Sequence, residues 1–243
     1  MENSNKKRTV EIYTGAYASG KSENAINRAL EYRKKNKTIT LVDLDTVEPA
    51  YCMRPIEKVL RSYGIDLILQ SDYFGLGEAG SYVTNEQINC LKKNDDDVII
   101  DVGYGVTGLD TLDIVTGIDD EKDIQIFLVI NTAKFETHDK DSILEYMEFN
   151  SGENKKPWKK ITGLISNTHL GDETTPEDII RGYEILKEVS SATNIPIVAI
   201  SIDSAIKDDF KKFLDKKEGP ETKDKYQNTP VRYLDRHMPK ALW

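Results

Sequence analysis

The residues best suited to chemistry lie near the N-terminus, where two glycines, a lysine and a serine stand at a fixed spacing. The stretch from Gly15 to Ser22 reads GAYASGKS and has the pattern G-x-x-x-x-G-K-[ST] of a phosphate-binding loop. Its glycines let the backbone curl, so that N–H groups point inward toward phosphate oxygens. We expect Lys21 to reach the β- and γ-phosphates of a nucleotide, and the Ser22 hydroxyl to ligate Mg²⁺.

The residues on either side of this loop supply the context that the motif needs. In residues 9–14 polar and apolar side chains alternate and β-branched residues are frequent, which predicts a strand. Apolar residues from Ala25 to Leu30 recur at helical spacing, which predicts a helix directly after the loop. The first turn of that helix would add free N–H groups and the positive end of its dipole to the anion site. The alternative is an ordinary glycine-rich turn with a solvated lysine.

Acidic residues follow two further apolar runs, at the places where strands of an open α/β sheet present ligand-binding groups. Asp101 ends the run 98–101, which predicts a carboxylate near Mg²⁺, and Gly103 could bring a backbone N–H against the γ-phosphate. Asp43 and Asp45 end the run 38–42, where one could hold a Mg²⁺-bound water and the other orient the attacking water. The alternative is that both aspartates only cap the next segment.

Composition limits the classes of protein to which the chain can belong. It has 243 residues, of which 38% are hydrophobic and 31% charged, and its formal net charge is -9. This acidic balance argues against general nucleic-acid binding, which needs a basic face. No apolar run is long enough for a membrane span, and the first residues lack the apolar core of a signal peptide. We therefore expect a cytoplasmic protein.

Strand-like and helix-like stretches alternate along the chain, which is typical of a parallel sheet covered by helices. The predicted fold class is α/β, a three-layer sandwich with a mostly parallel central sheet and helices on both faces. We expect one domain over residues 1–243, with a core at about 8–203 and a C-terminal extension, 204–243, that packs on the core. Residues 124–130 are apolar enough for the sheet centre, and capping patterns predict helix starts at Thr84 and Thr175.

The chain resembles a known class of proteins in four stretches: the loop at 15–22, LVDLD at 41–45, IIDVG at 99–103 and ITGLISNTHL at 161–170. Together they look like the SIMIBI branch of P-loop NTPases. Within it, they resemble the CobQ/CobB/MinD/ParA nucleotide-binding group, especially its poorly characterised bacterial ATP-binding members. The resemblance implies the P-loop NTPase fold, with ATP and Mg²⁺ as ligands.

The resemblance also implies roles for individual positions. Lys21, Asp43 and Asp45 would be the catalytic residues, with Asp45 aligning the attacking water. Residues 46–54 would form switch I and 103–109 switch II. The implied Mg²⁺ residues are Ser22, Asp43 and Asp101. The expected nucleotide-contacting residues are Gly15, Ala18, Ser19, Gly20, Lys21, Ser22, Glu23, Gly103 and, at the base, Asn167.

Two differences from that group bear on the oligomeric state and on the nucleotide that we expect. Ala16 stands where MinD and ParA carry a second lysine that reaches the partner subunit, so homodimerisation stays open. The guanine-specific patterns N-K-x-D and T-K-x-D are absent, since the two candidate stretches read NTAK at 131–134 and NTHL at 167–170. We therefore expect ATP rather than GTP. A lone loop histidine such as His169 is more often a solvated or capping side chain than a catalytic base.

Three functions remain open on the sequence. The first is a slow, Mg²⁺-dependent ATPase that acts as a nucleotide switch for an unidentified protein partner. The second is an ATP-dependent phosphotransferase or ligase of the BioD-like type, with Arg54 and Arg61 as substrate-binding candidates. The third is a non-hydrolysing ATP-binding metal-cluster chaperone, for which Cys52 lies beside the implied switch I. Cys52 and Cys90 would otherwise be two small buried or half-buried residues.

Overall fold

The computed structural model describes residues 8–46, 53–70, 83–93, 95–150, 156, 159–217 and 229–238. Its centre is an eight-stranded sheet in the order β3-β2-β4-β1-β5-β6-β7-β8, and every neighbouring pair is parallel. The strands are β1 (Val10–Gly15), β2 (Ile39–Leu44), β3 (Asp66–Ile68), β4 (Asp97–Val102), β5 (Ile124–Ile130), β6 (Gly163–Ser166), β7 (Ile197–Asp203) and β8 (Val231–Leu234).

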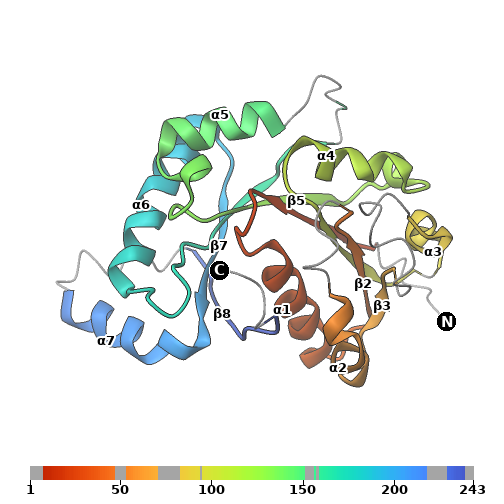
Figure 1. Cartoon of the computed structure of the whole chain (residues 1–243), viewed down its shortest axis with the longest axis horizontal. Coiled ribbons are helices and arrows are strands. Elements are labelled where there is room, and N and C mark those ends of the chain that lie inside the picture. The colour runs from red at the N-terminus through yellow and green to blue at the C-terminus, as the bar shows by residue number, and fades with distance from the viewer. Residues whose placement is uncertain are drawn as a thin grey trace, which may run out of the picture.

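Helices cover both faces of this sheet (Figure 1). The described α-helices are α1 (Lys21–Lys34), α2 (Glu57–Ser62), α3 (Asn85–Ile88), α4 (Gly105–Asp110), α5 (Lys140–Asn150), α6 (Pro176–Thr193) and α7 (Lys207–Lys217). Apolar residues of α1 and α2 pack on one face, whereas those of α4, α5 and α6 pack on the other. The predicted three-layer α/β sandwich is confirmed. None of the helices in the described ranges is long and apolar enough to cross a bilayer.

Local sequence signals account for where several helices begin. Thr84 accepts from the Gln87 N–H and forms a capping box at α3, as predicted. Thr175 does the same with Asp178 at α6, whose first residue is the expected Pro176. These caps satisfy N–H groups that the first helical turn leaves without partners.

The C-terminal part of the chain contributes a strand that the sequence pattern did not reveal. β8 pairs in parallel with β7, from Ile200 opposite Val231 to Asp203 opposite Leu234. It forms one edge of the sheet, and β3 forms the other. Within residues 229–238, β8 is therefore a strand of the central sheet itself, and residues 235–238 form the segment that follows it.

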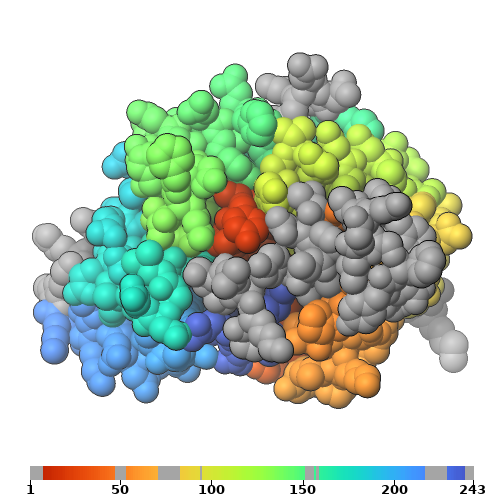
Figure 2. Space-filling model, viewed as in Figure 1, coloured from red at the N-terminus to blue at the C-terminus, as the bar shows by residue number. Residues whose placement is uncertain are grey.

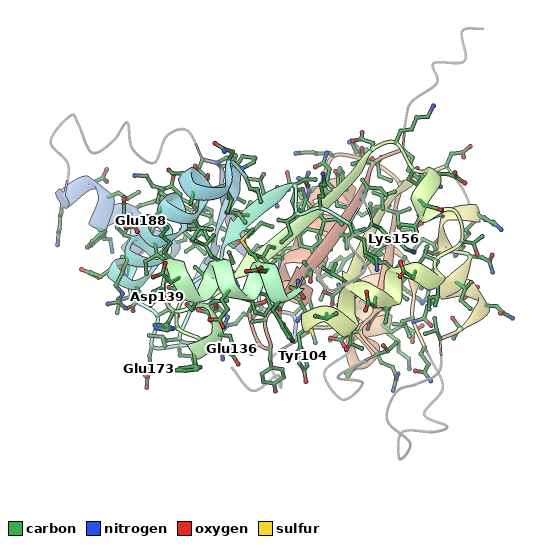
Figure 3. The ribbon with its side chains drawn as sticks, turned by 90° about the horizontal axis from the view of Figure 1, so that it is seen from above. Tyr104, Glu136, Asp139, Lys156, Glu173 and Glu188 are labelled. Atoms are coloured by element: carbon green, nitrogen blue, oxygen red, sulfur yellow. The ribbon has the colours of Figure 1, made fainter. Side chains whose placement is uncertain are left out.

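Because all eight strands are parallel, their carboxyl ends meet at one edge of the sheet. The register places Asp101 of β4 opposite both Tyr13 of β1 and Asp43 of β2. In Figure 3 the labelled side chains Tyr104, Glu136 and Glu173, which follow β4, β5 and β6, lie along one side of the molecule. This edge is where the sequence-predicted site residues gather.

Candidate functional site

The phosphate loop joins the end of β1 to the start of α1, as the motif requires. Ala18 and Gly20 adopt positive φ values of 51° and 89°. A Cβ on Gly20 would lie 2.2 Å from the Asn167 Nδ2 atom, and one on Gly15 would lie 2.4 Å from the Val129 carbonyl oxygen. Glycine is therefore required at both positions, because the loop is pressed against the ends of β5 and β6. In Figure 2 the red residues of this region appear at the centre of one face, between green and teal parts of the chain.

Groups that favour an anion point into this loop. Lys21 is buried, and its Nζ atom lies 3.4 Å from the Ala16 carbonyl oxygen. The N-cap of α1 is Gly20, so no side chain caps the N–H groups of the first helical turn. The hydroxyl oxygens of Thr14 and Ser19 are buried without a hydrogen-bond partner. A buried cation beside uncapped N–H groups is the arrangement that binds phosphate at a helix N-terminus.

The residues present also suit a magnesium ion at the mouth of the loop. Asp101 is 1% exposed, and burial raises the pKa of its carboxyl well above the ordinary value, although Lys21 acts in the opposite direction. One carboxylate oxygen of Asp101 has no hydrogen-bond partner, and Ser22 hydrogen-bonds to the same side chain. Ser22 and Asp101 both offer oxygen donors, and Mg²⁺ is bound by one or two such protein groups and completes its shell with phosphate and water.

Asp43 contacts both ends of the segment predicted as switch I. Its carboxylate accepts hydrogen bonds from the Asp45 N–H at 3.0 Å and the Met53 N–H at 2.8 Å. Burial is the main cause that raises the pKa of Asp43 to about 6. The main-chain oxygen of Asp43 accepts from the Gln87 side chain at 2.6 Å. Asp43 thus holds the chain on either side of residues 47–52. These residues, which include Cys52, lie outside the described residues.

The predicted switch II segment contains a close backbone contact. Gly103 follows β4, and a Cβ on Gly108 would lie only 1.8 Å from the Gly103 carbonyl oxygen. The N–H of Gly105, at the start of α4, donates to the Tyr146 hydroxyl oxygen at 3.3 Å. Tyr104 meets Tyr17 of the phosphate loop edge to face, with ring centroids 5.7 Å apart. The segment after β4 therefore touches the loop directly.

Asn167 and Glu23 make contacts that the sequence did not predict. The Asn167 amide donates to the Ser19 carbonyl oxygen at 2.7 Å, so it supports the phosphate loop from β6. The Glu23 carboxylate accepts from the N–H groups of His237 and Met238 at 2.7–3.0 Å. Both side chains line a cavity of about 50 Å³ beside the loop. The cavity is bounded by Gly20, Glu23, Asn167, Thr168, His169, Gly171, Thr174, Ile179, Ser201, Ile202, Asp203, Leu234 and Arg236.

His169 is a half-buried neighbour of the loop, and the pKa of its side chain is lowered. Burial and the charge of Lys134 lower its pKa to about 4. Cys90 is also buried, and burial raises the pKa of its thiol to about 11. A metal-binding thiolate needs the opposite environment. Trp158 and Trp243 lie outside the described residues.

Sequence reasoning missed two contributions to this region because both depend on long-range contacts. Asn24 of α1 donates to the Gly20 carbonyl oxygen at 2.9 Å and accepts from the Ser201 hydroxyl at 2.6 Å, which links β7 to the loop. Arg236, in the segment after β8, reaches the cavity from the far end of the chain. The charged tail sequence alone gave no sign that this arginine lies near the phosphate loop.

Comparison with solved structures places this architecture among known folds. The signal recognition particle receptor FtsY from Elizabethkingia anophelis matches with a TM-score of 0.55 and 16% identity, over 80% of this chain and 59% of the receptor. FtsY from Thermotoga maritima gives 0.56 and 16%, over 82% and 63%. FtsY from Mycoplasma mycoides gives 0.53 and 17%, over 81% and 60%. The chain thus spans about three-fifths of the length of these receptors.

No protein-family profile and no curated protein matches the chain. At this level of identity the structural likeness establishes the fold, and it does not single out the CobQ/CobB/MinD/ParA group. The chain has the parallel α/β fold of these FtsY structures, and a phosphate-loop sequence motif joins its strand β1 to helix α1.

Proposed function

We propose that the chain binds a Mg²⁺–nucleoside triphosphate in the loop Gly15–Ser22, hydrolyses it slowly, and acts as a nucleotide switch. The observation that carries this proposal is that two buried ionisable groups lie at the loop. Lys21 is buried in a loop whose two glycines leave no room for a Cβ, and Asp101, which has one carboxylate oxygen without a hydrogen-bond partner, lies next to Ser22. Burying both groups costs stability unless a ligand uses them, because unpaired buried polar groups are unfavourable.

Each residue has a distinct part in this proposal. Backbone N–H groups of the loop and Lys21 hold the β- and γ-phosphates. Ser22 and Asp101 would hold Mg²⁺, directly or through water, and Asp43 lies opposite Asp101 on the neighbouring strand β2. When bound, Mg²⁺ would neutralise charge that develops on the phosphate oxygens. Asp45 would orient the attacking water, and the N–H of Gly103 would face the γ-phosphate.

The switch itself rests on the two segments that meet the loop. The Asp43 carboxylate accepts hydrogen bonds from the N–H groups of Asp45 and Met53. A structural change at the triphosphate would therefore also move switch I. The close contact between Gly103 and Gly108 holds the first residue of switch II against helix α4. A partner protein would read the position of these segments, which is how phosphate-sensing switches act. Ala16 leaves open whether that partner is a second copy of the chain.

We propose ATP as the preferred nucleotide. Guanine-specific relatives pair an aspartate with the base at the fourth position of their motif, and in the two candidate stretches here that position holds Lys134 or Leu170. One FtsY structure similar to this chain was solved in complex with GDP, so guanine nucleotides are the alternative to test. Competition of unlabelled ATP and GTP against one fluorescent nucleotide decides between them. Tighter displacement by GTP would overturn the preference for ATP.

The test of the proposed function is nucleotide binding and phosphate release by the purified chain with Mg²⁺. Lys21→Ala should lose both, because the buried ammonium is the main positive charge at the phosphates. Lys35→Ala is the matched control, since Lys35 follows α1 and its side chain is 61% exposed. Equal turnover by Lys21→Ala and wild type would remove the proposal.

Within the ranges that the structure describes, no observed contact favours either of the two alternative functions. The Arg54 Nε atom donates to the Gln70 carbonyl oxygen at 2.7 Å, and Arg61 pairs with Glu57 on α2. A phosphotransferase would instead present such arginines to a substrate beside the γ-phosphate. Cys90 is buried with a raised thiol pKa, whereas Cys52, on which the metal-cluster alternative depends, lies outside the described residues.

A further inference from the structure

The segment after β8 lies against α1, the helix that starts at the phosphate loop. Asn27 of α1 makes two hydrogen bonds of 2.9 Å with the main chain of Asp235, one to its oxygen and one from its N–H. The Ser204 hydroxyl donates to the Asp235 side chain at 2.6 Å. Figure 2 shows the dark blue C-terminal residues on the same face as the red loop region and the teal β6–α6 connection. The segment is therefore fixed on both sides.

Glu23 provides the second anchor, one helical turn before Asn27. Its carboxylate is buried and accepts the N–H groups of both His237 and Met238. Met238 also packs against the apolar core between α1 and the sheet. Glu23 directly follows Ser22, so the residue that holds the C-terminal segment is adjacent to the phosphate site. The position of residues 235–238 is thus determined by the same helix that positions the phosphates.

Arg236 lies between these anchors, and its side chain lines the cavity beside the loop. Its Nε atom is 2.9 Å from an Asp203 carboxylate oxygen, and its Nη2 atom pairs with Asp172. Two carboxylates that hold one edge of a guanidinium fix its plane but leave its flat face free to stack. The rest of the wall includes apolar side chains, such as Ile179, Ile202 and Leu234. A planar cation beside apolar groups is suited to a purine ring.

We propose that Arg236 contacts the nucleoside of the bound nucleotide and that the segment 235–238 forms one wall of the base site. This inference rests on the proposed nucleotide binding. The cavity of about 50 Å³ is lined by Gly20, by Asn167 after β6 and by residues of β7, whereas Asp101 lies on β4, on the other side of β1 in the sheet. It is smaller than the ~300 Å³ of typical ligand pockets, so lining side chains outside the anchored segment 235–238 must move when the base binds. Asp203 and Asp172 keep the guanidinium in place while that happens.

The test compares Mg²⁺–ATP with Mg²⁺–tripolyphosphate, which has the phosphates but no nucleoside. Titration calorimetry on Arg236→Ala should show ATP affinity reduced about tenfold, as expected for a lost stacking partner, and tripolyphosphate affinity within about twofold of wild type. Arg236→Lys should show the same ATP-selective loss, because lysine keeps the charge and lacks the flat fork. Arg181→Ala is the matched control, since Arg181 is 69% exposed on α6 and pairs only with Asp178 among the described ion pairs.

Equal losses for ATP and tripolyphosphate in Arg236→Ala would overturn this inference, since Arg236 would then act only on the loop or the fold. Unchanged ATP affinity in Arg236→Ala or Arg236→Lys would overturn it as well. If the proposal of nucleotide binding is itself wrong, the result is different, because the wild-type chain then binds neither ATP nor tripolyphosphate. Thermal unfolding of each variant, with the midpoint close to wild type, establishes that the compared proteins are folded.

Discussion

The side-chain amide of Asn167, at the end of β6, donates a hydrogen bond of 2.7 Å to the main-chain oxygen of Ser19 in the phosphate loop. Asn167→Ala leaves that oxygen without its partner, which costs about 1–3 kcal/mol for a buried group. We therefore expect weaker binding of both ATP and tripolyphosphate by about tenfold, from the same titrations. If ATP affinity alone fell, Asn167 would be a base contact, as the resemblance to other nucleotide-binding proteins implies.

The effect of steric crowding at Gly20 can be separated from the effect of its positive φ by comparing Gly20→Ala with the same substitution at a second glycine. Gly20 and Gly117 have φ values of 89° and 84°, but a Cβ would meet Asn167 only at Gly20, and nothing within 4 Å at Gly117. Alanine at either position costs about 1 kcal/mol for the left-handed conformation. Gly20→Ala should in addition displace Asn167 and abolish nucleotide binding, whereas Gly117→Ala should bind normally. Normal binding by Gly20→Ala would show that the loop can move away from β6.

Asp43 should control the amide protons at both ends of switch I. In Asp43→Ala the N–H groups of Asp45 and Met53 lose their acceptor, so hydrogen exchange at both should quicken at least about tenfold for the loss of ~1.5 kcal/mol. Asp66→Ala, which removes a half-exposed partner of Lys93 on the edge strand, is the control. Exchange that speeds up at only one of the two amides would contradict a shared anchor.

The strand ends and the loop could be predicted because their signals are local or follow from parallel geometry. A glycine loop between a strand and a helix identified Gly15–Ser22, and two apolar runs that end in aspartate placed Asp43 and Asp101 at one edge. The structure confirms that neighbourhood, with Asp43 and Asp101 opposite each other on β2 and β4. Capping boxes are equally local, which explains why the helix starts at Thr84 and Thr175 were found.

The remaining features depend on residues far apart in sequence. β8 is only four residues long and includes Arg232 and Tyr233, so no apolar run distinguishes it. Its place is determined by pairing with β7 and by the contacts of the following segment with Glu23 and Asn27. Neither the partner strand nor the helix face can be recognised from the tail. Arg236 was missed for the same reason.

A buried ion pair between β1 and α1 was also not visible in the sequence. Glu11 is 2% exposed, and Arg28 donates to both of its carboxylate oxygens at 2.8–3.2 Å, while Tyr13 and Tyr32 donate as well. Arg28→Ala leaves a buried charge with reduced compensation, so we expect a loss of about 3–5 kcal/mol in the free energy of unfolding. Urea unfolding measures this loss, and the exposed Arg181→Ala should change stability by less than about 0.5 kcal/mol. A comparably small effect at Arg28 would mean that the tyrosines alone satisfy Glu11.

His169 should make the stability of the chain depend on pH between neutrality and pH 4. Burial and Lys134 lower its pKa to about 4 from the ordinary 6.5, so the folded chain binds this proton less readily than the unfolded chain. The stabilising contribution is therefore complete above pH 6.5 and is lost as the pH falls toward 4, by about 3 kcal/mol for a shift of this size. Urea unfolding of wild type and His169→Gln at pH 7, 5.5 and 4 isolates this contribution, since the other titrating groups are shared. A stability difference that stays constant over this range would show that the pKa of His169 is the same in the folded and the unfolded chain.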